Sequence, residues 1–314
     1  MPVGEYAVAS DTGRRRRRNE DNYVVAPPLF AVADGMGGAQ AGEVASKLAA
    51  SALEGGDSDG LSGLERVDAL IQEANRRIFD RASNDPSASG MGTTMTVALV
   101  EGMTVALGHV GDSRAYLVRG DSMEQLTEDH SLVNELLKSG KLSEEEAQIH
   151  PQRSVITRAV GTDPDVDVDA FTIEAENGDV FLICSDGLTD MVEDVDILEV
   201  VDRNRGDLEK AVKSLVQAAN KEGGEDNITA VAFRIDAAPD ETAANAEDTM
   251  TMPAVSDEPE EPDEKTREYA DVEEPAAEST GPTTAIDQKR VGIVLSALVL
   301  FLVLTAVLVW GLAR

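Results

Sequence analysis

Four aspartates stand where apolar segments of this chain begin or end, and their arrangement could support metal chemistry. Asp34 and Asp186 each follow an apolar run and precede a glycine, Asp112 follows a third run, and Asp226 precedes a fourth. Carboxylates grouped at buried strand ends repel one another, and burial raises the cost of their charge. A hard divalent cation such as Mg²⁺ or Mn²⁺ prefers oxygen ligands and would offset that cost. The pattern predicts a metal centre and favours hydrolysis.

Five consecutive arginines, Arg14 to Arg18, lie between a predicted strand and a polar, acidic group at residues 19–22. Such a run is typical of a solvated or nucleic-acid-binding patch. One guanidinium directed into a metal centre could instead bind a phosphate through two parallel hydrogen bonds. The spacing alone leaves both interpretations open.

Overall composition narrows the function further. The formal net charge is −33, from 27 basic and 60 acidic residues, which argues against a nucleic-acid partner. The single cysteine, Cys184, excludes an intramolecular disulfide and fits a reducing compartment. Because it lies inside an apolar segment, we interpret it as a core residue and not as a nucleophile.

Two C-terminal segments differ in composition from the rest. Residues 236–290 are rich in Ala, Pro, Glu, Asp and Thr, and residues 236–287 alone hold 17 acids and 2 bases, a net of −15. This composition predicts a disordered linker. Residues 291–313 carry no charge and would reach about 35 Å as a helix, enough to cross a bilayer core of about 30 Å. Lys289 and Arg290 precede this run, so we expect a single-pass anchor in the inner cell membrane with the larger domain in the cytoplasm.

Residues 1–235 are predicted to form one globular α+β domain. Apolar residues at helical spacing over 64–78 and 208–219 predict helices, and Ser143 with Glu146 predicts a capping box. Strands arranged in runs between helices favour antiparallel sheets. Turn dipeptides at 101–102, 120–121 and 177–178 predict hairpins between neighbouring strands. The predicted strands are Tyr6–Ser10, Leu29–Ala33, Thr94–Val100, Met103–Val110, Arg114–Arg119, Val166–Ile173, Val180–Cys184 and Ile228–Ile235.

Seven short motifs occur in order over nearly all of residues 5–235. They are Ser10-Asp-x-Gly13-x-x-Arg16-x-x-Asn19-Glu20-Asp21, Asp34-Gly35-Met36-Gly37-Gly38, Gly90-Met91-Gly92-Thr93-Thr94, Gly111-Asp112-Ser113-Arg114, Thr157-Arg158-Ala159-Val160-Gly161, Ser185-Asp186-Gly187 and Asp226-Asn227-Ile228-Thr229. In this order the chain resembles bacterial type-2C serine/threonine protein phosphatases. The resemblance implies a β-sandwich flanked by helix pairs, with a two-metal centre at one end.

The resemblance also implies which residues hold the metals. Asp34 would bridge two Mn²⁺ or Mg²⁺ ions, and the carbonyl of Gly35 would complete one coordination shell. Asp186 and Asp226 would hold the other ion. Asp112, sharing Asp186, would match the weaker third metal site of bacterial members.

Other roles follow from the same resemblance. Arg16 would bind the substrate phosphate, and Glu20 and Asp21 would orient metal-bound waters. Met36 stands where eukaryotic members often have a histidine thought to protonate the leaving group, and Ala39 stands where bacterial relatives commonly have one. The general acid is therefore unassigned, with a metal-bound water as the candidate. Residues from about 130 to 165 would form a mobile flap beside the cleft.

Histidine does not supply an obvious replacement, because none of the three histidines, His109, His130 and His150, occupies a motif position of that kind. We interpret them as structural or surface residues. A calcium-binding loop beginning at Asp165 is disfavoured because its sixth position is Ala170 and not glycine.

The expected function is metal-dependent hydrolysis of phosphoserine and phosphothreonine in proteins, by a monomer. Its expected partners are a Ser/Thr protein kinase of the same cell and the substrates of that kinase. The alternative is a catalytically silent, membrane-anchored relative that binds phosphoproteins. Such relatives usually lose metal ligands, whereas this chain retains every ligand that the motifs assign.

Overall fold

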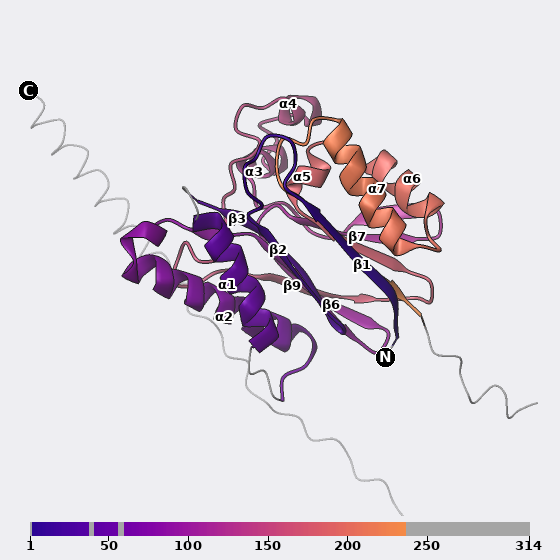
Figure 1. Ribbon diagram of the computed structural model, residues 1–314, viewed down its shortest axis with the longest axis horizontal. Helices are drawn as coiled ribbons and strands as arrows, with labels where there is room; N and C mark the ends of the chain where they lie inside the picture. The colour runs from indigo at the N-terminus through magenta and orange to yellow at the C-terminus, as the bar shows by residue number, and fades with distance from the viewer. Residues whose placement is uncertain (1, 38–40, 56–59, 237–314) are drawn as a thin grey trace, which may run out of the picture. The chain divides into compact units, whose positions relative to one another are not determined.

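Two antiparallel sheets stacked face to face form the centre of the fold, with helices on both outer faces (Figure 1). The computed structural model describes residues 2–37, 41–55 and 60–236. Within these ranges, no helix has the length and apolarity needed to span a membrane. The expected membrane helix at 291–313 and all of the expected linker after Asp236 lie outside the described residues.

Each sheet has five strands in its main path, and every recorded strand pair is antiparallel. The first sheet has the order β1 (Val3–Asp11), β11 (Ile228–Ile235), β10 (Val180–Cys184), β7 (Arg114–Arg119) and β8 (Ser122–Gln125). The second has the order β2 (Asp21–Ala26), β3 (Leu29–Met36), β5 (Met95–Glu101), β6 (Thr104–Val110) and β9 (Asp169–Glu174), and the short β4 (Gly92–Thr93) pairs with β3. The antiparallel α+β prediction is confirmed.

Apolar side chains from the two inner sheet faces interdigitate between the sheets. Phe30 of β3 stacks on Phe233 of β11 with 4.2 Å between ring centroids, and Phe233 stacks in turn on Phe181 of β10. All three rings are almost completely buried. Because the stack joins strands of both sheets, burial of these rings fixes the two sheets relative to each other.

Helices cover the outer faces in two groups. The helices α1 (Ala41–Gly55) and α2 (Gly63–Asn84) pack on the second sheet and share an apolar core with it. On the first sheet, a second core includes side chains from α5 (Asp186–Thr189), α6 (Asp194–Arg203) and α7 (Leu208–Lys221). Two short helices, α3 (Leu132–Lys138) and α4 (Glu144–Gln148), lie in the segment between β8 and β9, and α4 has the predicted capping box. The predicted helices at 64–78 and 208–219 correspond to α2 and α7.

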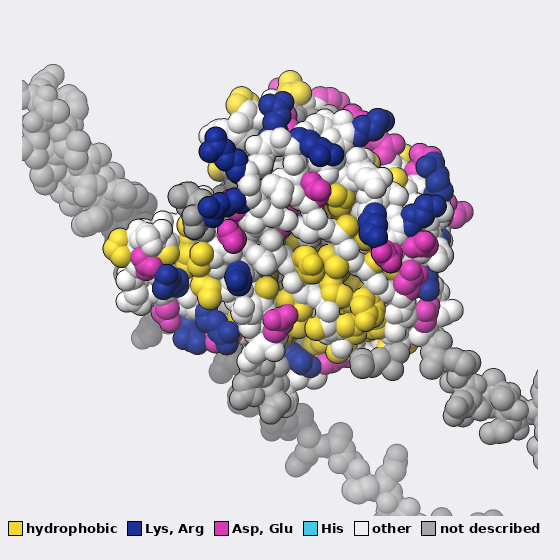
Figure 2. Space-filling view, in the orientation of Figure 1, with side chains coloured by type: hydrophobic (Ala, Val, Ile, Leu, Met, Phe, Trp, Pro, Cys, Tyr) yellow, Lys and Arg dark blue, Asp and Glu magenta, His cyan; other side chains and the backbone are white. Residues whose placement is uncertain are grey.

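One edge of the sandwich carries apolar side chains at the surface. Figure 2 shows them gathered where the edge strands β1 and β2 lie side by side in the view of Figure 1. Tyr6 of β1 is 47% exposed and packs its ring 5.9 Å from that of Phe30. The inter-sheet core therefore reaches the surface at this edge.

One turn and several elements differ from the sequence-based expectation. The dipeptide at 177–178 was expected to close a hairpin, but β9 pairs with β6 in the second sheet while β10 pairs with β7 and β11 in the first. That prediction was wrong, since the turn carries the chain from one sheet to the other. The prediction also missed four helices, α1, α3, α5 and α6, and three strands, β2, β4 and β8.

Candidate metal centre

The expected metal ligands gather at one end of the sandwich because the strands that carry them begin or end there. Asp34 lies near the end of β3, Asp186 opens α5 two residues after β10 ends, and Asp226 lies two residues before β11. Asp21, at the start of β2, is the direct cross-strand partner of Asp34. Asp34 lies close enough to Asp21, Asp186, Asp112 and Asp226 for all four charges to act on its carboxylate.

This crowding strongly favours protonated carboxyl groups. Burial raises the pKa of Asp34 well above its usual value, and the charge of Asp21 raises it further. Burial and the charge of Asp112 act in the same way on Asp186. Burial, followed by the charge of Asp129, raises the pKa of Asp112 to about 7. A positive charge in the centre would therefore stabilise the ionised forms of these carboxyl groups.

Two carboxylate oxygens in the centre also lack hydrogen-bond partners. Asp21 Oδ1 and Asp186 Oδ1 are both buried and accept no hydrogen bond. An unpaired buried oxygen of this kind is costly, and a divalent cation would satisfy it. In the described part of the chain, no three or more His, Cys, Asp or Glu side chains come together in an arrangement that could hold a metal ion as it stands. The donor chemistry and the unpaired oxygens nevertheless fit Mn²⁺ or Mg²⁺.

The backbone of Asp34 is held on both sides by residues of the Gly90–Thr94 motif. The Thr93 hydroxyl donates to the Asp34 carbonyl at 2.7 Å, and the backbone N–H of Thr94 donates to the same carbonyl at 2.8 Å. The backbone N–H of Asp34 donates to Thr94 Oγ1 at 3.0 Å. The sequence motif included both threonines, but their contact with Asp34 became evident only in the structure.

Gly35 lets the end of β3 touch the first turn of α1. A Cβ atom at Gly35 would lie 2.1 Å from the carbonyl oxygen of Gly42, and one at Gly42 would lie 2.6 Å from that of Gly35. Both distances are far below van der Waals contact, so only glycine fits at this crossing. The close approach fixes the helix directly behind Asp34.

Arg16 reaches the centre from the loop between β1 and β2. Its Nη2 donates to Asp226 Oδ2 at 2.5 Å, while its side chain remains 50% exposed. Burial opposes the charge of Arg16, but Asp226, Asp34 and Glu20 together raise its pKa. The structure thus places Arg16 beside the carboxylates with one side open to solvent.

Glu20 is the last residue of the same loop, and Asp21 opens β2 directly after it. The carbonyl of Glu20 accepts from the backbone N–H of Gly35 at 3.2 Å, and burial raises the pKa of its carboxyl group. Asp21 Oδ2 accepts from the hydroxyls of Ser185 and Thr229 at 2.8 and 2.7 Å. The structure therefore brings together all the residues that the motifs assigned to the centre.

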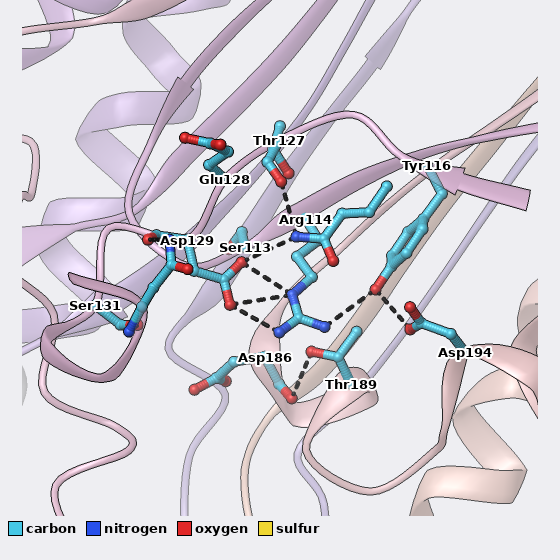
Figure 3. Close-up of polar contacts among 12 residues, drawn as sticks. Ser113, Arg114, Tyr116, Thr127, Glu128, Asp129, Ser131, Asp186, Thr189 and Asp194 are labelled. Carbon is cyan, nitrogen blue, oxygen red and sulfur yellow. Dashed lines mark hydrogen bonds and ion pairs between the residues drawn. The ribbon is translucent and has the colours of Figure 1, made fainter. Parts of the chain in front are cut away.

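An open cleft of about 780 Å³ extends from Asp112 and Asp186 toward the segment that contains α3 and α4. On its wall, Arg114 forms an ion pair with Asp129, with 2.7 Å between Nη2 and Oδ2 (Figure 3). Arg114 Nη1 also donates to the Tyr116 hydroxyl, which donates to Asp194 Oδ1. The prediction named Arg114 only as part of a motif and missed this network. Further acidic residues lining the cleft are Glu128, Glu144, Asp190 and Glu193.

The three histidines lie in structural positions. His109 is fully buried between Thr96 and the Glu128 carbonyl, and burial followed by the charge of His130 lowers its pKa to about 4. His130 Nδ1 accepts from the backbone N–H of Gly111 at 3.0 Å. His150 Nδ1 accepts from the backbone N–H of Gln152. These contacts agree with the interpretation that histidine serves the fold here.

The rejected calcium loop is replaced by a strand. Asp169 opens β9 and bonds to Arg158 Nη1 at 2.6 Å, while Glu176 pairs with Arg119. Residues of β9 alternate between partly buried and exposed, as in a half-buried strand. Two of the acidic side chains of this segment, those of Asp169 and Glu176, are therefore paired with arginines.

Comparison with known proteins gives consistent matches over the described domain. The family model described as protein phosphatase 2C matches residues 15–231. The serine/threonine phosphatase stp of Listeria innocua is 42% identical over 231 residues, covering 70% of this chain and 91% of that protein. A crystal structure of the Mycobacterium tuberculosis serine/threonine phosphatase PstP/Ppp is 40% identical, with a TM-score of 0.71, and covers 74% of this chain and 99% of that one.

A second solved structure is similar over the same region. It is the catalytic domain of the serine/threonine protein phosphatase PstP in complex with two manganese ions. It is 38% identical to this chain, with a TM-score of 0.69, and covers 74% of this chain and 99% of that one.

Proposed function

The chain belongs to the protein phosphatase 2C family, and we propose that it hydrolyses phosphoserine and phosphothreonine in proteins with two Mn²⁺ or Mg²⁺ ions. The family match identifies it as a protein serine/threonine phosphatase. The two-metal mechanism is our inference for this chain. It is supported by the buried aspartates at the strand ends and by the manganese-containing structure of a relative.

The observation that carries the proposal is the pair of unpaired carboxylate oxygens among carboxyl groups of raised pKa. Asp186 Oδ1 and Asp21 Oδ1 are buried without a hydrogen-bond partner. A site built only for stability would pair these atoms with N–H or O–H donors. Divalent cations would satisfy Asp186 Oδ1 directly and Asp21 Oδ1 through a bound water, and would offset the mutual repulsion of the carboxylates. Asp34, Gly35, Asp186 and Asp226 would hold two ions, and Asp112 with Asp186 would hold a third.

The bound ions would supply a water that is acidic enough to act as hydroxide near neutral pH. The chain itself binds and orients the substrate. Arg16 presents a partly exposed guanidinium beside the carboxylates, where it can donate hydrogen bonds to two oxygens of a phosphate. The same contact stabilises the negative charge that the phosphoryl group carries during transfer. Hydrolysis would exchange the phosphorus bond to the serine or threonine oxygen for one to the water oxygen, and the leaving oxygen would take up a proton that the water gives up.

A covalent phosphocysteine route is disfavoured by the structure of the only cysteine. Cys184 is fully buried in β10, and burial raises the pKa of its thiol to about 12. A thiol with that pKa holds its proton at neutral pH and is a poor nucleophile. Direct attack by water is therefore the favoured route.

The proposal is tested by turnover of a phosphothreonine peptide in Mn²⁺, Mg²⁺, Ca²⁺ or a chelator. We expect turnover in Mn²⁺ or Mg²⁺ and none in the chelator. The variant Asp34→Asn removes one ligand charge and keeps the side-chain shape, so its turnover should be low even when the metal is present. Turnover that persists undiminished in the chelator would contradict the metal-dependent mechanism, and folded protein without turnover in any metal would favour the silent, phosphoprotein-binding alternative.

The cellular setting is a separate part of the proposal. It is supported by the uncharged run at 291–313, by the basic pair before it and by the acidic composition of 236–290. A cytoplasmic phosphatase domain tethered to the inner membrane would meet membrane-bound phosphoproteins at raised effective concentration. A Ser/Thr protein kinase of the same cell, together with its substrates, is the proposed partner.

A further inference from the structure

One buried amide joins both ends of the loop that carries Arg16. Asn227 is only 3% exposed and comes directly before β11. Its Nδ2 donates to the carbonyls of Thr12 at 2.9 Å and Arg18 at 2.8 Å. Its Oδ1 accepts from the backbone N–H of Glu20 at 2.7 Å. A single side chain thus contacts the loop before and after Arg16.

The side-chain chemistry at this position is specific for asparagine. Two carbonyls require two donors and one N–H requires an acceptor, and the asparagine amide provides this combination. Aspartate would place an acceptor against two carbonyl oxygens, and an apolar residue would leave all three loop groups without this partner. The contacts therefore use the full hydrogen-bonding capacity that faces the loop.

The neighbouring backbone strengthens the same connection. The carbonyl of Gly224 accepts from the backbone N–H groups of Arg14 and Arg15 at 2.7 and 3.2 Å. Gly13 has a φ of +78°, and a Cβ atom there would lie 2.1 Å from the Asp226 carbonyl oxygen. The arginine loop is therefore packed directly on residues 224–227.

The same segment also supplies Asp226. The backbone N–H of Asn227 donates to Asp226 Oδ1 at 2.7 Å, while Asp226 Oδ2 accepts from Arg16. The metal ligand and the clamp on the arginine loop are therefore consecutive residues. A shift of the loop relative to this segment would change the position of Arg16 relative to the carboxylates.

We propose that Asn227 is the positioning residue for Arg16: its amide holds the loop of residues 12–20 so that the guanidinium meets the substrate phosphate beside the metal centre. This inference rests on the proposed function, because it assumes that Arg16 binds phosphate. Asn227 does not touch the substrate in this scheme and acts chiefly through Arg16. Loss of its amide should therefore lower activity mainly when Arg16 is present.

A matched control exists elsewhere in the fold. Asn75 in α2 is 1% exposed, and its Nδ2 donates to the carbonyls of Asp163 and Pro164, while its Oδ1 accepts from the backbone N–H of Gly161. It has the same burial and the same set of three backbone partners, but it clamps a different loop. Asn75→Ala therefore reproduces the loss of a buried amide without releasing the arginine loop.

The test is a double-mutant cycle in kcat/KM on a phosphothreonine peptide. Asn227→Ala should lower kcat/KM by about 10- to 100-fold in the wild-type background, since small displacements of a binding group have effects of this size. In the Arg16→Ala background the same change should cost less than about twofold, because acting through a shared partner makes effects non-additive. Asn75→Ala should have the same effect in both backgrounds.

Hydrogen exchange gives a readout that does not depend on activity. The backbone amides of Arg14, Arg15 and Glu20 should exchange faster in Asn227→Ala than in the wild-type protein. In Asn75→Ala their exchange rates should be unchanged. Asn227→Ser retains a short donor and acceptor, so its kcat/KM and its loop exchange rates should lie between those of the wild-type protein and the alanine variant. This variant can be measured if Asn227→Ala does not fold. Equal losses from the Asn227 substitution with and without Arg16, or unchanged exchange in the loop, would overturn the positioning role. If Arg16→Ala itself retained full kcat/KM while loop exchange increased in Asn227→Ala, the proposed phosphate contact would fail, and the anchoring of the loop would stand alone.

Discussion

Arg16 and Asp226, 210 positions apart in the chain, are joined by a hydrogen bond of 2.5 Å between Nη2 and Oδ2. Asp226, which is itself an expected metal ligand, thus also contacts the residue expected to bind the substrate phosphate. Because the two functions meet on one carboxylate, phosphate binding and metal binding at this centre should influence each other. The predictions below begin with this pair.

Arg16→Ala should lower kcat/KM by an amount equivalent to about 2–4 kcal/mol of transition-state binding, because it removes a charged phosphate contact. Arg15→Ala is the matched control, since Arg15 belongs to the same loop and is exposed. Steady-state kinetics on a small phosphopeptide checks both variants. Similar losses at the two positions would show that the loop acts through general charge and not through Arg16.

Asp34→Asn should reduce kcat by about a thousandfold or more while preserving the fold, because the neutral side chain is a weak ligand for a hard cation. Circular dichroism and thermal unfolding check the fold, and turnover in excess Mn²⁺ checks the activity. Asp121→Asn, in an exposed turn between β7 and β8, should leave turnover unchanged. Activity of the Asp34 variant within about tenfold of wild type would refute its role as a bridging ligand.

Asp112→Asn should stabilise the metal-free protein at high pH and not at low pH. The fold raises the pKa of Asp112 to about 7, above the unfolded value near 3.8, so the protonated form is favoured in the native state. Its stabilising contribution is complete below about pH 4 and is lost as the pH rises through about 7. Asparagine stays neutral at every pH. The variant should therefore become more stable than the wild-type protein as the pH rises from about 4 to about 7.

Thermal unfolding in chelator at pH 5 and pH 8 measures this effect. For a domain of this size, each kcal/mol of stability corresponds to about 2–4 °C in Tm. At pH 8 the Tm of Asp112→Asn should therefore exceed that of the wild-type protein by at least this amount. Saturating Mn²⁺ should reverse the order, because the wild-type carboxylate then gains a partner. A Tm difference that is the same at both pH values would contradict this account of Asp112.

Replacing the histidines singly should leave most of kcat. His109 is held between Thr96 and a backbone carbonyl with a pKa lowered to about 4, so it is neutral at the pH of turnover. His130 and His150 accept hydrogen bonds from backbone N–H groups. The substitutions His109→Gln, His130→Gln and His150→Gln should change thermal stability more than the pH profile of kcat. A hundredfold loss of kcat in one folded variant would identify that histidine as the missing general acid.

A protein that ends at Asp236 should fold and retain kcat/KM on a soluble phosphopeptide. All the residues that form the two sheets, their cores and the candidate centre lie before that point. Comparison with the full chain in detergent measures the effect, and carbonate extraction of membranes tests the expected anchor at 291–313. A loss of more than about tenfold on truncation would mean that the C-terminal part contributes to folding or catalysis.

The location of the candidate centre was predictable because its residues interrupt apolar runs. Asp34, Asp186 and Asp226 stand beside strands that the sequence pattern identifies, and strand ends bring such residues together. The class of the fold followed from runs of strands separated by helices. The motif spacing also separated Arg16 from its four neighbours, which local charge alone could not do.

Features that depend on distant partners were not predictable. The turn at Asn177 and Gly178 has the local signal of a hairpin, but which sheet receives β10 depends on its pairing with β7 and β11. The buried network around Arg114 joins Asp129 and, through Tyr116, Asp194, which is 78 positions from the tyrosine. The alanine-rich helix α1 was missed because alanine stripes give a weak hydrophobic pattern.

The crossing of Gly35 and Gly42 determines how stiff the centre is. With backbone against backbone, there is no flexible side chain between the end of β3 and α1 that could absorb a displacement. Movement of Asp34 toward the helix would have to carry with it all 15 residues of α1, which pack on α2 and on the sheet. The mechanical compliance behind Asp34 is therefore that of a whole packed layer of sheet and helices.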